Sequence, residues 1–282
     1  MSTPVSAYLR RLGITDPGSP SAGGLFALQR AHLERVAYDN IEIQLGRPPG
    51  IDPELSVRRF AAGRGGYCYH LNGGFAHLLE TLGYEVTRHV GGVLDDAASR
   101  EVNGGHLTLT VRVEGRAYWV DVGLGDGPHE PLPLREGAYR QGGSAYAMER
   151  LEPPAGEAPG WTFLSPLGHM PRVNFRDAPA TTADFEAMHT WMSTSEDSPF
   201  VRTFAVIRRD ADGADSLRGR VLTRSVPGKG KTERELSGPR EMFEVIEGLF
   251  RRRLDDLTPE DRAALWARVD AAHETWAASR TD

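Results

Sequence analysis

Cys68 is the only cysteine in the 282 residues, and its surroundings could give it chemistry. It follows the glycine-rich run RGGY at residues 64–67, a pattern that predicts a turn opening a helix at Cys68. The first turn of a helix presents unpaired N–H groups and the positive end of the helix dipole, which favour a thiolate over a thiol. The thiolate is the nucleophilic form of cysteine. The alternative, a small buried hydrophobic side chain, stays open on the cysteine alone.

A histidine and an aspartate on a predicted β-hairpin are the candidate partners of this cysteine. A two-residue turn at residues 114–115 would place Asp121 opposite Thr108. His106 is then a diagonal neighbour on the same face, within reach of a hydrogen bond between imidazole and carboxylate. The alternative for this pair is a half-buried contact at the edge of the sheet.

Together, Cys68, His106 and Asp121 would form a triad. The imidazole would take the thiol proton, and the carboxylate would orient the imidazole and stabilise its positive charge. A thiol hydrolase of the papain or transglutaminase type would use the same geometry, and a non-catalytic protein could retain the pocket alone.

The spacing of apolar residues changes from helical to alternating near residue 85. The helices expected before this point lie near residues 4–12, 24–37, 53–60 and 68–82. The strands expected after it include residues 86–94, 106–113 and 116–122, with further turn-rich strands as far as 167. A helix at 183–192, a hairpin-like pair at 204–208 and 216–224, and two closing helices complete the pattern. An antiparallel sheet or small barrel is therefore favoured over alternating βαβ units.

Composition restricts the class of protein. Hydrophobic content of 39% and charged content of 26% are typical of a folded globular protein. A single cysteine excludes an intramolecular disulfide and is consistent with a reducing compartment. The first residues do not form a signal peptide, and no apolar run is long enough to span a bilayer, so the cytoplasm is expected. The net charge of -6 argues against non-specific nucleic-acid binding.

Longer motifs around the candidate residues resemble the arylamine N-acetyltransferase family. These motifs are RGGYCY with Asn72, His106 at a strand start, DVGLG at 121–125, YDNI at 38–41, and DF and STSEDSPF at 184–185 and 193–200. The DG and LRGR motifs at 212–213 and 217–220 are similar to the third domain of that family. The resemblance covers almost the whole chain.

The resemblance implies an α+β fold whose core is similar to that of cysteine proteases and transglutaminases. The parts expected from it are an N-terminal helical bundle with the nucleophile at 1–85, a central antiparallel β-barrel with the histidine and aspartate at 86–182, a linker helix at 183–203 and an α/β lid at 204–282.

The resemblance also implies a reaction. Acetyl-CoA would be the co-substrate, without a bound cofactor or metal, and a small aromatic amine would accept the acetyl group in a ping-pong mechanism. Cys68 would carry the thioester, His106 would be the base and Asp121 would orient it. Amide synthases of the same family release or cyclise a polyketide chain, and under that alternative an acyl carrier protein would be a partner. Neither nucleic acid nor a membrane is expected as a partner.

Further site residues follow from the resemblance alone. The expected pocket residues are Tyr38, Tyr69 and Phe200, for which core packing is an equal alternative. Arg64 would brace the cysteine loop against Asp39, which stands where the family usually has a glutamate. Leu124 occupies a position where an aromatic residue is common, so the acceptor site should differ in shape. His70 and Leu71 likewise stand where acidic or polar residues are frequent.

Three other patterns have plainer interpretations. Gly73 and Gly74 interrupt a predicted helix, which suggests that another backbone or a ligand approaches closely there. The GKGKT run at 228–232 lacks a glycine that a phosphate-binding loop requires and predicts a hairpin tip, with contact to CoA phosphates as a weaker alternative. The three arginines at 251–253 predict a solvated helix end.

Overall fold

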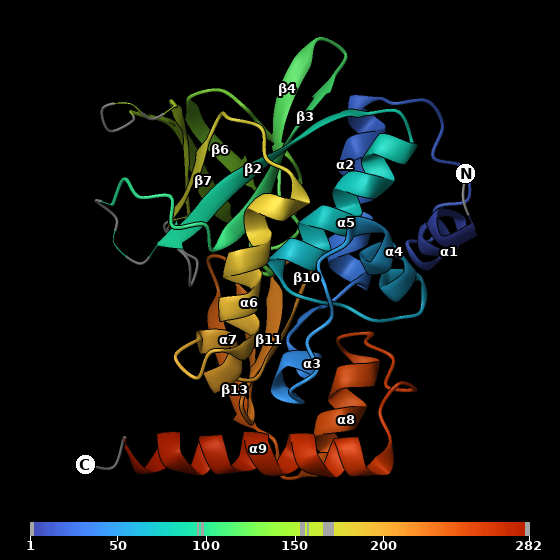
Figure 1. Cartoon of the computed structure of the whole chain (residues 1–282), viewed down its shortest axis with the longest axis vertical. Coiled ribbons are helices and arrows are strands. Elements are labelled where there is room, and N and C mark those ends of the chain that lie inside the picture. The colour runs from blue at the N-terminus through green and yellow to red at the C-terminus, as the bar shows by residue number, and fades with distance from the viewer. Residues whose placement is uncertain are drawn as a thin grey trace.

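The computed structural model describes residues 3–94, 96, 99–152, 156, 158–165 and 172–279. It has the expected α+β fold, with helices against a nearly closed antiparallel barrel and a second, smaller sheet beside two C-terminal helices (Figure 1). In the part of the chain covered by this description, no helix combines the length and apolar composition that crossing a bilayer requires.

The N-terminal part is a bundle whose helix starts follow local capping rules. Its helices are α1 (Thr3–Arg11), α2 (Ala22–Arg35), α3 (Ile41–Gln44), α4 (Pro53–Ala61) and α5 (Cys68–Thr81). Asp52 caps α4 by accepting from Leu55 N, with Pro53 as the first helical residue. Helix α5 begins at Cys68, as predicted, and Gly83 follows its end with a φ of 91°.

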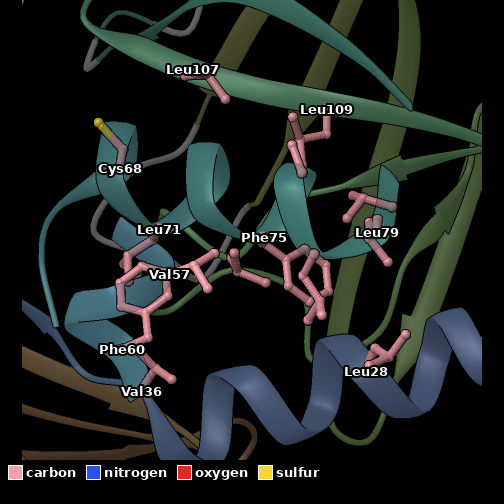
Figure 2. Close-up of a cluster of buried hydrophobic side chains, with 14 of the residues drawn as sticks. Leu28, Val36, Val57, Phe60, Cys68, Leu71, Phe75, Leu79, Leu107 and Leu109 are labelled. Atoms are coloured by element: carbon pink, nitrogen blue, oxygen red, sulfur yellow. The ribbon is translucent and has the colours of Figure 1, made fainter. Parts of the chain in front are cut away.

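Helix α5 is the centre of the bundle. Figure 2 shows Cys68 at its start, with Leu71, Phe75 and Leu79 along the helix and with Leu107 and Leu109 on a neighbouring strand. These side chains belong to one buried hydrophobic cluster that joins the bundle to the barrel. The helix that carries Cys68 is thereby held between the bundle and the barrel.

The two glycines of α5 have different surroundings. A Cβ atom on Gly74 would lie 2.5 Å from the Phe60 ring and 3.0 Å from the Cβ of Ser56, both on α4. A Cβ atom on Gly73 would have no neighbour within 4 Å. The predicted approach of another backbone is therefore wrong: side chains of α4 approach Gly74, and outside the helix itself no atom of the described residues lies within 4 Å of the Cβ position of Gly73. The predicted approach of a ligand stays a prediction.

Eight antiparallel strands form the barrel. They are β2 (Glu85–Leu94), β3 (His106–Val113), β4 (Arg116–Val120), β5 (Leu132–Pro133), β6 (Gly137–Gln141), β7 (Ser144–Leu151), β8 (Gly160–Leu164) and β9 (Arg172–Arg176). Their spatial order is β5-β4-β3-β2-β9-β8-β7-β6. Strand β9 was not predicted, and residue 167, the last of the predicted strands, lies outside the described residues.

The register of the β3–β4 hairpin is the predicted one. Val113 pairs with Arg116, and Glu114 and Gly115 form the two-residue turn with φ values of 51° and 71°. Positive φ at both turn positions matches the right-handed twist of the strands.

Both faces of this hairpin are buried. One face packs on α5, while Trp119 on the other face stacks on Phe163 inside the barrel and donates a hydrogen bond of 2.7 Å to Thr108. The face that carries His106 and Asp121 is therefore interior, which simple alternation of polar and apolar residues did not predict.

The second sheet links the cysteine loop to the C-terminal part. Its strands, in spatial order, are β1 (Tyr38–Asp39), β10 (Ala205–Arg209), β11 (Ala214–Arg218), β12 (Val221–Val226) and β13 (Gly230–Glu235). Tyr38 pairs with Ile207 on β10 and forms a bridge with Gly66 on its other side. The run predicted as one strand at 216–224 is two strands, because the chain reverses at Gly219, where φ is 56°.

Five further helices connect and close the fold: η1 (Thr182–Phe185), α6 (Glu186–Thr194), α7 (Pro199–Arg202), α8 (Pro239–Gly248) and α9 (Pro259–Ala278). Helix α9 lies across the end of the molecule farthest from the barrel (Figure 1). The GKGKT run forms the β12–β13 turn and the start of β13, so the predicted hairpin tip is confirmed.

The solvated helix end predicted at 251–253 is wrong for its central residue. Arg252 is completely buried, and its guanidinium donates two hydrogen bonds of 2.8 Å to the carboxylate of Asp256. A local run of three arginines predicts exposure, but in the folded protein Arg252 points inward and lies beside acidic partners.

Candidate active site

Cys68 lies at the first turn of α5, only 3% exposed. Its Sγ–H donates to the Gly105 carbonyl at 3.7 Å. Gly105 directly precedes His106 at the start of β3, so the helix start and the strand start meet at the sulfur. This is the junction that sequence alone could not demonstrate.

His106 and Asp121 form the predicted hydrogen bond. Nε2 of His106 lies 2.7 Å from Oδ2 of Asp121, and both side chains are buried. The other carboxylate oxygen accepts from Gly123 N at 2.8 Å and from Asn72 Nδ2 at 3.1 Å. Because Nε2 is engaged, Nδ1 of His106 is the nitrogen left for the thiol.

Asn72 holds the carboxylate to the nucleophile helix. It lies one turn after Cys68 and donates also to the Leu107 carbonyl at 2.7 Å, while its own oxygen accepts from Val122 N at 2.9 Å. Asn72 belongs to the sequence motif around Cys68, but no role was predicted for it. The spacing of four residues from Cys68, which places both on one helix face, was the available signal.

Gly123 allows the strand end to pass directly over the nucleophile. A Cβ atom there would lie 2.9 Å from Cα of Cys68 and 2.6 Å from Nδ2 of Asn72. Any side chain at this position would push Asp121 and Cys68 apart. The glycine therefore sets the separation within the site.

The surroundings of His106 favour its protonated form. Burial lowers its pKa, but the charge of Asp121 and hydrogen bonds to Asp121 and Cys68 outweigh burial and raise the pKa to about 10. At neutral pH, an imidazolium held by a carboxylate can stand beside the sulfur. Neutral His106 can take the thiol proton, and the imidazolium that results can give this proton to a leaving group.

A cavity of about 540 Å³ opens onto these groups. Of the predicted site residues, Cys68, His106, Tyr38, Leu124 and Phe200 line it. The other lining residues, which were not predicted, are Val93, Asn103, Gly105, Gly123, Met188, Trp191, Met192 and Pro199. Among these described lining residues there is no aspartate, glutamate, lysine or arginine, so the wall is mainly apolar. The volume is that of a small-molecule site.

Helix α6 supplies one wall of the cavity through Met188, Trp191 and Met192. The spacing of these residues, three and four apart, is that of one helix face and was the signal that could have identified them. Trp191 is 46% exposed.

Tyr69 does not line the cavity, contrary to the prediction. It is buried, and its hydroxyl donates to the Gly104 carbonyl at 2.5 Å. Successive helical residues point about 100° apart, so Tyr69 faces away from the wall that holds Cys68.

The predicted brace between Arg64 and Asp39 is also wrong. Arg64 pairs with Asp255 at 2.8 Å and Asp256 at 3.1 Å. Asp39 instead faces Arg252, whose Nε lies 3.5 Å from Oδ2. Arg252 enters from the C-terminal segment and occupies the place beside Asp39 that Arg64 was expected to take.

Asp39 still contacts the cysteine loop. Its backbone N–H donates to the Gly66 carbonyl at 2.9 Å, and a Cβ atom on Gly65 would lie 2.4 Å from its Oδ2. Burial raises the pKa of Asp39, while nearby Arg252 lowers it. The loop before Cys68 is thus packed directly against a buried acid.

His70 lies behind the nucleophile. Its Nδ1 accepts from Tyr67 N at 3.4 Å and its Nε2 donates to the Pro49 carbonyl at 3.3 Å. Burial, with nearby Arg59 and His189, lowers the pKa of His70 to about 3, so it is neutral. This chain therefore has an uncharged hydrogen-bond acceptor at the start of the helix.

Known proteins resemble this chain over most of its length. An N-acetyltransferase family model matches residues 23–258. The arylamine N-acetyltransferase of Mycolicibacterium smegmatis is 30% identical over 284 residues, which cover 95% of this chain and 99% of that protein. Proansamycin X synthase of Amycolatopsis mediterranei is 30% identical over 154 residues, 52% of this chain and 59% of that protein. The structure of Mycobacterium marinum arylamine N-acetyltransferase in complex with CoA aligns with a TM-score of 0.82 and 25% identity, over 95% of this chain and 99% of that one.

Proposed function

The chain belongs to the arylamine N-acetyltransferase family, and we propose that it moves an acetyl group from acetyl-CoA to an arylamine through a thioester on Cys68. The observation that carries this proposal is the 2.7 Å bond between His106 and Asp121 beside the only cysteine, at the wall of a cavity. The CoA complex of the Mycobacterium marinum relative supports the choice of donor.

In the first half-reaction, His106 takes the proton of the Cys68 thiol at Nδ1. The thiolate attacks the acetyl carbonyl carbon, a bond forms to Sγ and the bond to the CoA sulfur breaks. His106 then returns the proton to that sulfur, and CoA leaves as a thiol. Asp121 holds the imidazole in place and balances its charge throughout.

In the second half-reaction, the amine nitrogen attacks the thioester carbonyl. The bond to Sγ breaks, His106 takes a proton from the amine nitrogen, and the amide leaves. Cys68 is again a thiolate beside an imidazolium. The apolar wall that includes Tyr38, Leu124 and Phe200 suits an aromatic ring and keeps water from the thioester.

Intact mass spectrometry tests this proposal directly. Incubation with acetyl-CoA alone should add one acetyl group to the protein, and 4-aminobenzoate should then remove it and yield the amide. Cys68→Ala should take up no acetyl group. His106→Gln removes the base and should acetylate Cys68 far more slowly than wild type. His89→Gln is its matched control and should react like wild type, because His89 is buried in the barrel but does not line the cavity. A wild-type protein without the adduct, or turnover by Cys68→Ala, would refute the proposal.

The same triad could serve an amide synthase acting on a carrier-bound acyl chain. The apolar cavity, with Leu124 in its wall, and the partial match to proansamycin X synthase favour this second function. Loading Cys68 from an acyl carrier protein faster than from acetyl-CoA would support it. Release of the loaded acyl group by water faster than by any amine would instead indicate a thiol hydrolase.

A further inference from the structure

A second pocket, of about 490 Å³, lies on the outer side of the helical bundle, away from the residues that line the catalytic cavity. Five arginines line it: Arg10 and Arg11 on α1, Arg35 at the end of α2, and Arg251 and Arg253 in the segment after α8. The remaining lining residues are Ala7, Ala61 and Gly63. Figure 1 shows α1 on the same side of the molecule as the connection between α8 and α9.

The charge in this pocket is incompletely balanced by the protein itself. Nη1 of Arg35 lies 3.7 Å from Oε2 of Glu34, and Nη2 of Arg253 lies 2.8 Å from Oδ2 of Asp255. The side chains of Arg10 and Arg251 are exposed and have no ion pair within the described residues. Five arginines converge here although the chain as a whole carries a net charge of -6.

Arg11 holds its positive charge in a largely buried position. Burial, with smaller contributions from Arg252 and Arg64, lowers the pKa of Arg11 to about 10 against the opposing effects of Tyr8 and Asp39. Arg11 remains charged at neutral pH. An anion in the pocket would reduce the repulsion between the arginines and would replace the water that burial removes from Arg11.

We propose that this pocket binds a compact polyanion that carries two or more linked phosphate groups. Guanidinium groups pair with phosphate oxygens through two parallel hydrogen bonds, and several such groups around one concave site suit a diphosphate or triphosphate. The pocket would recognise the phosphate chain and not a nucleobase, because none of the described residues that line it has an aromatic side chain.

The ligand would tie together segments that hold the loop before Cys68. Arg11 donates 2.6 Å bonds to the carbonyls of Phe60 and Arg64, and to the Arg251 carbonyl at 3.2 Å. Arg253 N donates to the Gly63 carbonyl at 3.0 Å. Because the three segments form this pocket only in the folded protein, binding stabilises the fold.

Calorimetric titration and thermal unfolding with inorganic tripolyphosphate test the proposal. At physiological salt we expect one binding site per chain, a rise in Tm, weaker binding of diphosphate and still weaker binding of orthophosphate. ATP should bind no more tightly than tripolyphosphate, because nothing in the pocket stacks on a base. Tighter binding of ATP, or no binding of tripolyphosphate at millimolar concentration, would overturn the assignment.

The double variant Arg10→Gln/Arg251→Asn locates the site. Asparagine is chosen because Arg251 has a φ of 57°, a left-handed conformation that asparagine tolerates. Losing two charge-assisted contacts should weaken binding roughly tenfold or more. Arg116→Gln/Arg140→Gln removes the same charge from exposed positions elsewhere and should bind like wild type.

CoA also carries phosphate groups, so the catalytic cavity must be separated from this pocket. Under the proposal, saturating CoA does not displace tripolyphosphate, and Arg10→Gln/Arg251→Asn acetylates Cys68 at the wild-type rate. Displacement by CoA one for one, or equal binding by the two double variants, would place the anion elsewhere and overturn the proposal. Neither result would affect the proposed acetyl transfer.

Discussion

Two buried histidines flank Cys68, one on the strand side and one on the helix side, and their pKa values shift in opposite directions. Each side chain is about equally buried, His106 at 1% exposed and His70 at 1% exposed. The pKa of His106 rises to about 10, whereas that of His70 falls to about 3. Burial lowers both values, so burial does not explain the difference.

The charge of the neighbours explains it. His106 faces the Asp121 carboxylate, while His70 lies near Arg59 and His189. The strand side therefore has a histidine that carries a proton, and the helix side has one that only fixes the backbone.

The buried acids differ in a parallel way. Asp121 accepts hydrogen bonds at both oxygens, from His106, Asn72 and Gly123. Oδ2 of Asp39 has no hydrogen-bond partner among the described residues and depends on Arg252 at 3.5 Å. The strand side is therefore arranged for proton transfer, whereas the helix side holds the cysteine loop together.

Among the variants that compare the two sides, Asp121→Asn should have the largest effect on activity. The amide keeps the size of the carboxylate but cannot balance an imidazolium, so His106 loses its raised pKa. We expect kcat/KM to fall by about 10³–10⁴, as when the acid of a hydrolase triad is replaced by its amide. Stopped-flow acetylation of Cys68 measures this fall. Asp39→Asn is the matched control, and an equal loss in both variants would break the distinction between the two sides.

Arg252→Met should have the largest effect on stability. It leaves Asp39 as a buried acid without its cation, and we expect the free energy of unfolding to fall by about 3–5 kcal/mol. Urea unfolding measures the change. Arg253→Met, at an exposed ion pair, should cost at most about 1 kcal/mol. The double variant Asp39→Asn/Arg252→Met should recover much of the loss, and failure to do so would show that packing, not charge, dominates there.

The pH dependence of stability should separate the two histidines by sign. The pKa of His70 is lower in the folded state than the unfolded value of about 6.5, so its protonation destabilises the fold as pH falls from about 6.5 towards 3. The raised pKa of His106 stabilises the fold below about 6.5, and this contribution disappears as pH rises towards 10. Each histidine changes the free energy of unfolding by at most about 1.4 kcal/mol per pH unit.

Urea unfolding at a series of pH values checks these slopes. The pKa of His32 is also lowered to about 3, mainly by burial, so His70→Gln should remove only part of the acid-side slope. His106→Gln should flatten the alkaline side and leave the acid side unchanged. An acid-side slope unaffected by His70→Gln would mean that His70 does not stay neutral in the folded protein.

Features set by short-range rules could be predicted from the sequence. The turn at 114–115 fixed the register of β3 and β4 and thereby the meeting of His106 and Asp121. The helix start at Cys68 followed from a glycine-rich turn before an apolar stripe. Both depend on residues that are close along the chain.

Features set by distant residues could not be predicted in this way. Asp39 and Arg252 meet only when opposite ends of the chain fold together, so the run of arginines at 251–253 indicated a solvated surface. The resemblance suggested Arg64 as the partner but could not show that Arg252 occupies the space. The wall formed by α6 was missed because only the fold turns Met188 and Met192 towards Cys68.

Strand β1 has a consequence for the synthesis of the protein. Tyr38 lies between Gly66 of the cysteine loop and Ile207 of β10. The carbonyl of Gly63 accepts a hydrogen bond from Arg253 N, and Asp39 pairs with Arg252. A chain made from its N-terminus produces Cys68 long before these partners emerge from the ribosome. The supported loop is completed only by residues near the end of translation, so a prematurely terminated chain would carry the thiol without the supported nucleophile loop.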